Sequence, residues 1–202
     1  MANSLTRRNL FGLLAATAAA VAVPSSAAFS LTENEAKKLV ENLISIFKRV
    51  GQSEISDEKF IAEFEKALGQ FSDIPIIARS ALGRPWRNAT RQQKIEFTLV
   101  FQSHVARKYG KILRKFASNE LEIRSARKIK NFVEVSSVVR RAGGQPIDIR
   151  WLVSDKSGQT KLFDIILEGV SMVRAERSEI QLMLDKRKGD IDLLITDLGA
   201  RI

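Results

Sequence analysis

The sequence of 202 residues contains no cysteine and a single histidine. The absence of cysteine excludes a disulfide, a thiolate zinc site, a cysteine nucleophile and a lipid-anchored cysteine. There is also no Gly-x-Ser-x-Gly nucleophile motif, no glycine-rich phosphate loop and no paired metal-ligand spacing. Few of the parts from which enzymes assemble an active site are therefore present. His104 adjoins an apolar helical stripe, and we expect it to pack or to form a hydrogen bond.

Long apolar runs are missing as well. The N-terminal stretch GLLAATAAAVAV is apolar, but it is too short and too rich in alanine to span a bilayer stably. It follows Arg7 and Arg8 and precedes the small residues PSSAA, which predicts a cleaved export signal over residues 1–28. The context TRRNLF favours a twin-arginine signal, with an ordinary Sec signal as the alternative. Cleavage after Ala27 and cleavage after Ala28 both fit, and we take Ala28.

Acidic residues are outnumbered by basic ones. The chain has 33 Lys and Arg against 23 Asp and Glu, a net charge of +10, and loss of the two signal arginines leaves 10 − 2 = +8. Such an excess favours phosphate-bearing or acidic partners. The aromatic residues follow helical and strand stripes instead of alternating with exposed basic positions, and an exported protein rarely meets nucleic acid. We therefore expect no nucleic-acid partner, and either a solvated basic face or docking to an anionic membrane or acidic protein.

Helical periodicity extends over residues 32–117. Four start signals each precede an apolar stripe with helical spacing; they are Thr32, Ser56, Asp73 and Thr90. The stretch RPWRNA between the third and fourth helices is expected to be a loop, because Pro85 cannot continue a helix. The first part of the mature chain is therefore predicted to be entirely helical.

The period changes to two over residues 121–169, where four strand candidates are separated in part by glycine-containing turns. Strict alternation would place Phe163, Ile165 and Leu167 on one face, opposite Asp164 and Glu168, which we expect to lie on a solvated or salt-bridged face. Two more helices are predicted over about residues 171–200. The order of helices, antiparallel sheet and helices predicts an α+β fold.

Two stretches carry a resemblance to a known family. They are DIPIIARSALGRPWRNATRQQKIEF and GGQPIDIRWLVSDKSGQTKLFDIILEGVSMVRAERSEI. Both are similar to segments of the toluene-tolerance, or MlaC, family of periplasmic phospholipid-binding proteins, and the likeness covers roughly residues 32–198. The sequence departs at Glu176, where relatives commonly carry an aromatic residue. A related branch is associated with hopanoid biosynthesis, so this departure bears on which lipid is bound.

The resemblance implies an NTF2-like α+β domain over residues 29–202, in which a four-stranded antiparallel sheet and helices enclose an apolar pocket. It implies a non-catalytic carrier with phospholipid as cargo and no cofactor. The implied partners are an MCE-domain component of an inner-membrane ABC transporter, similar to MlaD, and an outer-membrane lipoprotein-porin complex, similar to MlaA. The protein is expected to act as a monomer in the periplasm and to help maintain outer-membrane lipid asymmetry.

Apolar residues of the long helix and the sheet are the candidate pocket walls, since a carrier must bury alkyl chains as well as a bilayer does. These candidates are Phe97, Phe101, Val105, Tyr109, Ile149, Trp151, Phe163, Ile165, Leu167 and Val170. Each could instead belong to a packed core, because pocket walls and cores use the same residue types. Two other functions stay open at this point: an NTF2-like enzyme with Asp164 or His104 as general base, and a docking subunit with a filled core.

Overall fold

The structure is a computed structural model that describes residues 31–116, 119–140 and 143–200. The helices are α1 (Glu33–Gly51), α2 (Asp57–Phe71), α3 (Ile74–Leu82), the 3₁₀ helix η1 (Arg84–Arg87), α4 (Arg91–Phe116), α5 (Met172–Lys186) and α6 (Ile191–Ala200). The strands are β1 (Glu120–Ile129), β2 (Phe132–Arg140), β3 (Ile147–Ser154), β4 (Lys161–Leu167) and β5 (Val170–Ser171). The predicted α+β class, with helices packed on an antiparallel sheet, is confirmed, whereas the predicted export signal lies outside the described residues.

Side-chain caps explain where the helices begin. The Thr32 hydroxyl accepts a hydrogen bond from the backbone N–H of Glu35, and the Glu35 carboxylate accepts one from the Thr32 backbone N–H at 2.8 Å. The Asp73 carboxylate caps α3 by accepting a hydrogen bond from the backbone N–H of Ile76. The segment RPWRNA is not a plain loop as expected, because residues 84–87 form one 3₁₀ turn. Pro85 is tolerated in the first turn, where its missing N–H has no partner to lose.

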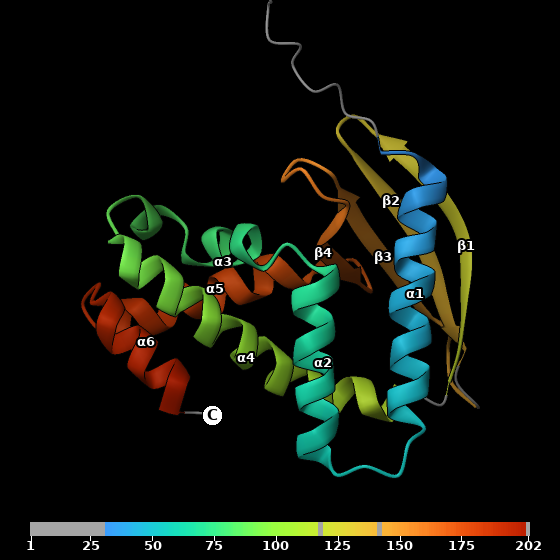
Figure 1. Cartoon of the computed structure of the whole chain (residues 1–202), viewed down its shortest axis with the longest axis horizontal. Helices are drawn as coiled ribbons and strands as arrows, with labels where there is room; N and C mark the ends of the chain where they lie inside the picture. The colour runs from blue at the N-terminus through green and yellow to red at the C-terminus, as the bar shows by residue number, and fades with distance from the viewer. Residues whose placement is uncertain (1–30, 117–118, 141–142, 201–202) are drawn as a thin grey trace, which may run out of the picture.

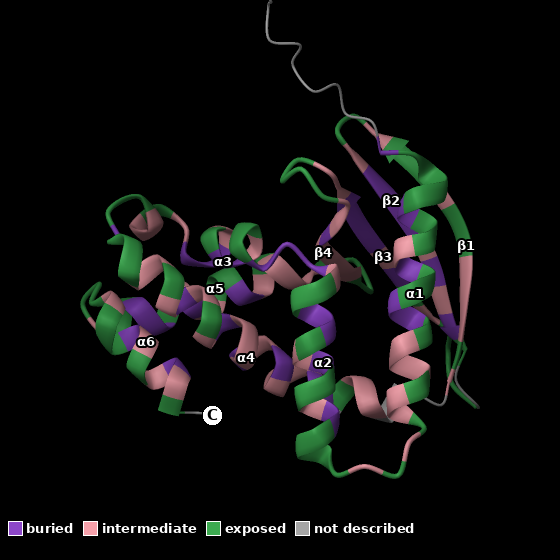
Figure 2. Ribbon diagram, in the orientation of Figure 1, coloured by how far each residue is buried: buried purple, intermediate pink, exposed green. Residues whose placement is uncertain are grey.

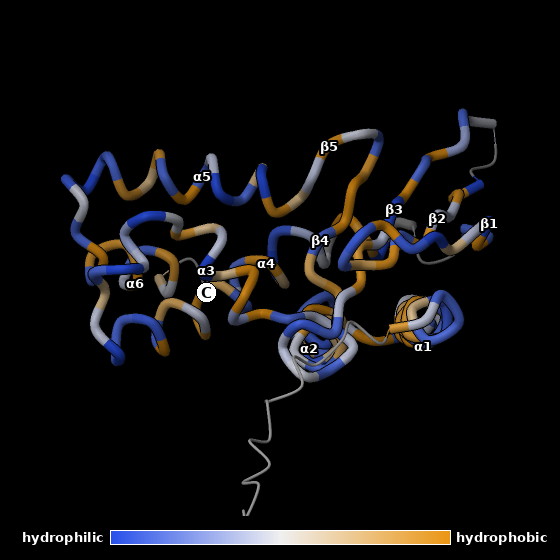
Figure 3. Tube along the Cα trace, turned by 90° about the horizontal axis from the view of Figure 1, so that it is seen from above, coloured by the Kyte–Doolittle hydropathy of each residue, from blue (hydrophilic) through white to orange (hydrophobic). Residues whose placement is uncertain are grey.

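The sheet is an antiparallel meander in the order β1-β2-β3-β4-β5. All four predicted strands are present, and the two-residue β5 was not predicted. In Figure 1 the sheet and α1 form one end of the molecule, α3 to α6 form the other, and α2 stands between them. Figure 3, a view from above, shows α1 and α2 on one side of the sheet and α5 on the other.

Three groups of buried apolar residues make up the core. The first lies between α1 and the sheet, the second joins α3 to α4, α5 and α6, and the third joins α2 to α4. Figure 2 shows the corresponding buried faces on α1, on α4 and along β2 and β3. Within the described ranges, no helix is both long enough and apolar enough to cross a membrane.

A two-residue turn joins β4 to β5. Leu167 pairs with Val170, and the two residues between them, Glu168 and Gly169, have φ values of +49° and +82°. Positive φ at both central residues is the geometry of a type I′ hairpin turn, which glycine adopts without strain. The Glu168 carboxylate accepts a hydrogen bond from the backbone N–H of Asp148 at 2.7 Å, which holds the turn against β3.

Gly169→Val is expected to lower the free energy of unfolding by about 1–2 kcal/mol. A Cβ atom at this position would meet no other atom within 4 Å, so the penalty comes from the backbone conformation and not from a clash. Gly169→Asn is the matched control, since asparagine tolerates positive φ, and its penalty should be clearly smaller. Urea unfolding curves of the two variants decide the matter. Equal stability of Gly169→Val and the parent protein would show that the turn can relax.

Candidate functional site

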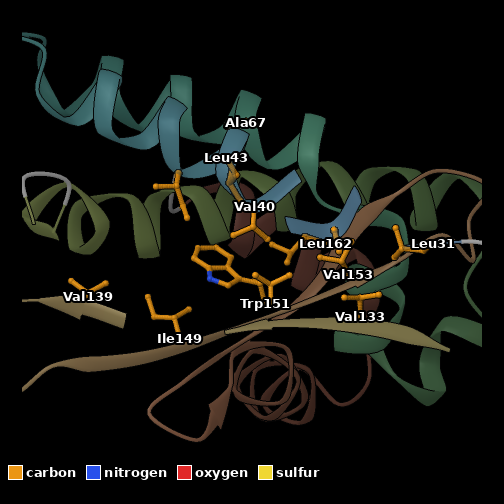
Figure 4. Packing of buried hydrophobic residues seen from close by; sticks show 13 residues of the cluster. Leu31, Val40, Leu43, Ala67, Val133, Val139, Ile149, Trp151, Val153 and Leu162 are labelled. Carbon is orange, nitrogen blue, oxygen red and sulfur yellow. The ribbon is translucent and has the colours of Figure 1, made fainter. Parts of the chain in front are cut away.

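The inner face of the sheet is covered by α1, and apolar side chains pack between them (Figure 4). The buried members of this α1–sheet cluster are Leu31, Ala36, Val40, Leu43, Ile44, Ala67, Val133, Val135, Val139, Ile149, Trp151, Val153 and Leu162. The indole N–H of Trp151 donates a hydrogen bond to the hydroxyl of Ser137 at 2.8 Å, and that hydroxyl donates to the backbone carbonyl of Ile149 at 3.4 Å. Ser137 is itself buried on β2. The side chains of the cluster are therefore apolar apart from the indole N–H of Trp151, whose hydrogen bond is satisfied.

The structure divides the predicted wall residues among separate places. Ile149 and Trp151 belong to the α1–sheet cluster, and Ile165 packs against it. The residues predicted on the long helix do not join them there. Phe97 and Phe101 are fully buried among α3, α5 and α6, Val105 packs between the second and third clusters, and Tyr109 packs against the third. The ten candidates therefore do not line one common cavity.

A β-bulge changes the face on which Phe163 lies. Val153 pairs with Leu162 and Leu152 pairs with Asp164, so Phe163 is the extra residue of β4. Strict alternation was therefore a wrong expectation here, because the bulge places Leu162 and not Phe163 beside Ile165 in the α1–sheet cluster. Phe163 instead meets Phe132 edge to face, with ring centroids 5.6 Å apart.

The last two predicted wall residues lie at the surface. Leu167 is 36% exposed and Val170 is 54% exposed, on either side of the β4–β5 turn. They line neither of the two hollows described next.

Two hollows lie on either side of α1, one beside β1 and the other beside the end of α2. The first, of about 440 Å³, lies between α1 and β1, and we call it the α1–β1 groove; its lining residues are Lys37, Glu41, Ile44, Ser45, Lys48, Leu121 and Ile123. The second, of about 320 Å³, is lined by Glu35, Leu39, Asn42, Gln70, Phe71 and Thr160. None of these residues was predicted as a site. A signal for the first hollow was present in the sequence, because its five residues on α1 follow one another at helical spacing along one side of the helix. They are Lys37, Glu41, Ile44, Ser45 and Lys48.

The two carboxylates considered for chemistry on β4 and its turn have structural roles. Asp164 accepts hydrogen bonds from the Ser171 hydroxyl at 2.6 Å and from the backbone N–H of Val173 at 3.1 Å, which fixes the start of α5. Glu168 holds the hairpin turn, as described above. Glu168 is exposed, which agrees with the solvated face expected from the sequence. Asp164 is half-buried and hydrogen-bonded to the start of α5, which differs from that expectation. In the described part of the chain, no group of three or more potential metal-ligating residues occurs.

A buried polar network that the sequence did not predict joins α4 to α5. Glu176 is 2% exposed, and one of its carboxylate oxygens accepts from Lys108 Nζ at 2.6 Å and from Tyr109 Oη at 2.5 Å. The other oxygen lies 3.4 Å from His104 Nε2, a contact that becomes an ion pair when the imidazole is protonated. Lys108 also reaches Glu179 at 2.5 Å. Burial alone would raise the pKa of Glu176, but its three partners outweigh burial and hold that pKa at about 2.

Glu176→Gln is expected to lower the free energy of unfolding at pH 7 by about 3 kcal/mol. A pKa of about 2 in the folded state against 4.5 in the unfolded state means that the ionised carboxylate stabilises the fold above about pH 4.5. This stabilisation is lost as the pH falls from 4.5 towards 2, and the variant should show a flatter loss over that range. Urea midpoints at pH 7 and pH 3 measure both effects.

Glu179→Gln provides the control for this pair of measurements. Its carboxylate binds the same Lys108, but its side chain is 38% exposed, so the change should cost less than about 1 kcal/mol. The account of the network would be wrong if both glutamates gave the same loss, or if the difference between the parent protein and Glu176→Gln persisted unchanged at pH 3.

Comparison with known proteins places the chain in a family. The family described as "MlaC protein" matches residues 37–200, which is most of the chain. The chain belongs to the MlaC family. A relative within reach of sequence comparison is the intermembrane phospholipid transport system binding protein MlaC of Haemophilus influenzae, 23% identical over 195 residues, covering 93% of this chain and 88% of the relative.

A solved structure shares the fold. It is a phospholipid-binding protein from Ralstonia solanacearum in complex with a phospholipid, and it superimposes with a TM-score of 0.67 at 20% sequence identity. The match covers 82% of this chain and 93% of the solved one. The MlaC family and the α+β fold predicted from the sequence are therefore both confirmed.

Proposed function

We propose that this member of the MlaC family is a periplasmic phospholipid carrier that has no catalytic step. It would take phospholipid between an outer-membrane lipoprotein-porin complex and the MCE-domain component of an inner-membrane ABC transporter, with lipid as cargo and no cofactor. The observation that carries the proposal is the family match over residues 37–200. It is supported by the function named for the Haemophilus influenzae relative and by the phospholipid bound to the Ralstonia solanacearum neighbour.

The α1–sheet cluster is our proposed site for the acyl chains. Each CH₂ group that leaves a bilayer must be buried again, at about 0.8 kcal/mol per group, so the site has to be apolar and extensive. The α1–sheet cluster meets this requirement, and a hollow opens beside α1 on each of its sides. Of the residues predicted from sequence, Ile149, Trp151 and Ile165 remain candidate wall residues. Phe97 and Phe101 are better explained as helical packing.

An enzymatic function receives little support from the groups considered for it. Asp164 is occupied in capping α5, and His104 is 7% exposed beside Glu176. A general base needs both access to substrate and a proton to abstract. The carrier is therefore the function that these residues favour.

Native mass spectrometry of the purified protein, followed by lipid extraction, tests the carrier. We expect a mass higher than that of the mature polypeptide by one phospholipid, and a diacyl phospholipid in the extract. A bare polypeptide mass from cells that make phospholipid normally, together with no uptake from vesicles, would favour the docking subunit with a filled core.

The export signal over residues 1–28 remains part of this proposal. Replacement of Arg7 and Arg8 by lysine is expected to abolish accumulation in the periplasm, because the twin-arginine route distinguishes guanidinium from ammonium groups whereas a Sec signal needs only positive charge. Cell fractionation and immunoblotting measure the effect. Normal periplasmic accumulation of the double lysine variant would instead identify a Sec signal.

A further inference from the structure

We propose that the α1–β1 groove is the phosphate end of the lipid site, with the Lys48 ammonium and the Ser45 hydroxyl as the groups that bind the phosphate. This inference rests on the proposed carrier function and assigns a particular place to the headgroup. The occupant is an amphiphile with two alkyl chains and a phosphate, and it follows from the chemistry of the groove.

The floor of the groove is continuous with the α1–sheet cluster. Ile44 belongs to that cluster and is 9% exposed, while Leu121 and Ile123 of β1 pack against it. An alkyl chain that lies on these three residues would therefore lie against the outer edge of the cluster that contains Trp151 and Ile149. The volume of about 440 Å³ is within the range of about 300–1,000 Å³ that is usual for small-molecule sites.

The rim of the groove carries one unneutralised cation. Lys37 forms an ion pair with Glu41 at 3.8 Å, and both of these residues line the groove. Lys48 has no ion-pair partner among the described side chains, although it is half-buried. Ser45, which precedes it by three residues, lies on the same side of α1, so the hydroxyl and the ammonium are neighbours. An ammonium beside a hydroxyl suits a phosphate oxygen.

An anion can bind at Lys48 although this residue lies in the last turn of α1. Backbone carbonyls at a helix C-terminus carry partial negative charge, but Arg49, the second basic residue in that turn, offsets it. Lys37 lies eleven residues earlier, about 16 Å along the axis, so a single phosphate cannot contact both lysines. The phosphate is therefore assigned to the Lys48 end, and the chains to the floor.

The second hollow has the wrong charge for the same ligand. It has no basic residue, and Glu35 lies on its rim. Hydrogen bonds from the backbone N–H and the hydroxyl of Thr32 lower the pKa of the Glu35 carboxyl, which keeps it ionised. A phosphate would be repelled there. The two hollows thus differ in charge although they flank the same helix. A substitution in the second hollow can therefore serve as the control for a substitution in the α1–β1 groove.

Uptake from vesicles of two lipids tests the assignment. The probes are phosphatidylglycerol and a diacylglycerol with the same chains, so that only the phosphate headgroup differs. Lys48→Met is expected to weaken binding of phosphatidylglycerol about tenfold and to leave diacylglycerol unchanged. Lys59→Met, on the exposed face of α2, is the control and should change neither. Equal binding of phosphatidylglycerol by Lys48→Met and the parent protein would overturn the assignment.

Two bulky substitutions on α1 test the groove independently of charge. Ser45→Trp would obstruct the α1–β1 groove and is expected to abolish uptake of both lipids, whereas Asn42→Trp would obstruct only the second hollow and should leave uptake intact. The reverse pattern, or no effect of either change, would contradict the proposal. Both variants are expected to fold because both positions are exposed, and circular dichroism is the measurement that checks this.

The remaining outcomes separate this inference from the carrier function. If the parent protein takes up neither lipid, the proposed function itself fails. If the parent protein binds phosphatidylglycerol but Lys48→Met and Ser45→Trp both bind it equally well, the carrier stands and the groove assignment fails. Binding of glycerol 3-phosphate alone at Lys48 with the affinity of the lipid would show a site for free phosphate and would also overturn the assignment.

Discussion

Phe101→Asp is expected to leave the protein unfolded at room temperature. Phe101 is fully buried on α4 and its ring lies 5.7 Å from that of Phe97, among apolar side chains of α3, α5 and α6. A carboxylate there would have no partner, and burying it without one costs several kcal/mol in addition to the lost aromatic packing. The total stability of a domain is about 5–15 kcal/mol, so most of it would be lost.

Far-UV circular dichroism and thermal melting measure this effect. Leu99→Asp is the control on the same helix, because Leu99 is 61% exposed and an acidic residue there should change stability by less than about 0.5 kcal/mol. A folded Phe101→Asp protein would show that water reaches this cluster. That result would return Phe101 to the list of lipid-contacting residues.

Ile165→Asp is expected to keep the fold and to lose the lipid. Ile165 is half-buried at the border of the α1–sheet cluster, paired with Trp151, so a carboxylate at this position can be hydrated when no lipid is bound. An acyl chain beside it would force that carboxylate to be desolvated or neutral, at a cost of several kcal/mol. Co-purified phospholipid should fall to roughly a tenth of the parent level or less.

Ile166→Asp is the matched control for this change. Ile166 lies on the opposite face of β4 and pairs with Arg150, which can receive the new carboxylate. Lipid content should stay near that of the parent protein. A folded Ile165→Asp protein with a full complement of lipid, or an equal loss in both variants, would remove this face of the sheet from the proposed site.

The fold was largely predictable because its signals are local. Thr32 is the N-terminal cap of α1, which begins at Glu33, and Gly83 is the C-terminal cap of α3, which ends at Leu82. Both caps can be predicted because they depend only on hydrogen bonds with backbone groups a few residues away. The change from helical to strand spacing after residue 120 is also local. What the sequence could not reveal was the bulge at Phe163, because one extra residue in a strand leaves no mark in its composition.

The candidate site was less predictable because it depends on contacts between distant segments. Phe101 and Trp151 belong to the same class of residue, yet one packs among helices and the other faces α1. Glu176 meets Lys108 from 68 residues away, so no spacing rule could relate them. The departure at Glu176 from an expected aromatic residue was the only sign of that network. Sequence patterns thus identified apolar surfaces but not their partners.

Photocrosslinking with a phospholipid that carries a diazirine in its acyl chain tests the central claim most directly. After uptake from vesicles and irradiation, mass spectrometry of peptides locates the attached lipid. The account predicts labelling on α1 and on the inner face of β1 to β4, at residues such as Ile44, Ile123 and Ile165. Labelling confined to α3, α5 and α6 would contradict it. Labelling no higher than that of a control protein that binds no lipid would contradict it as well.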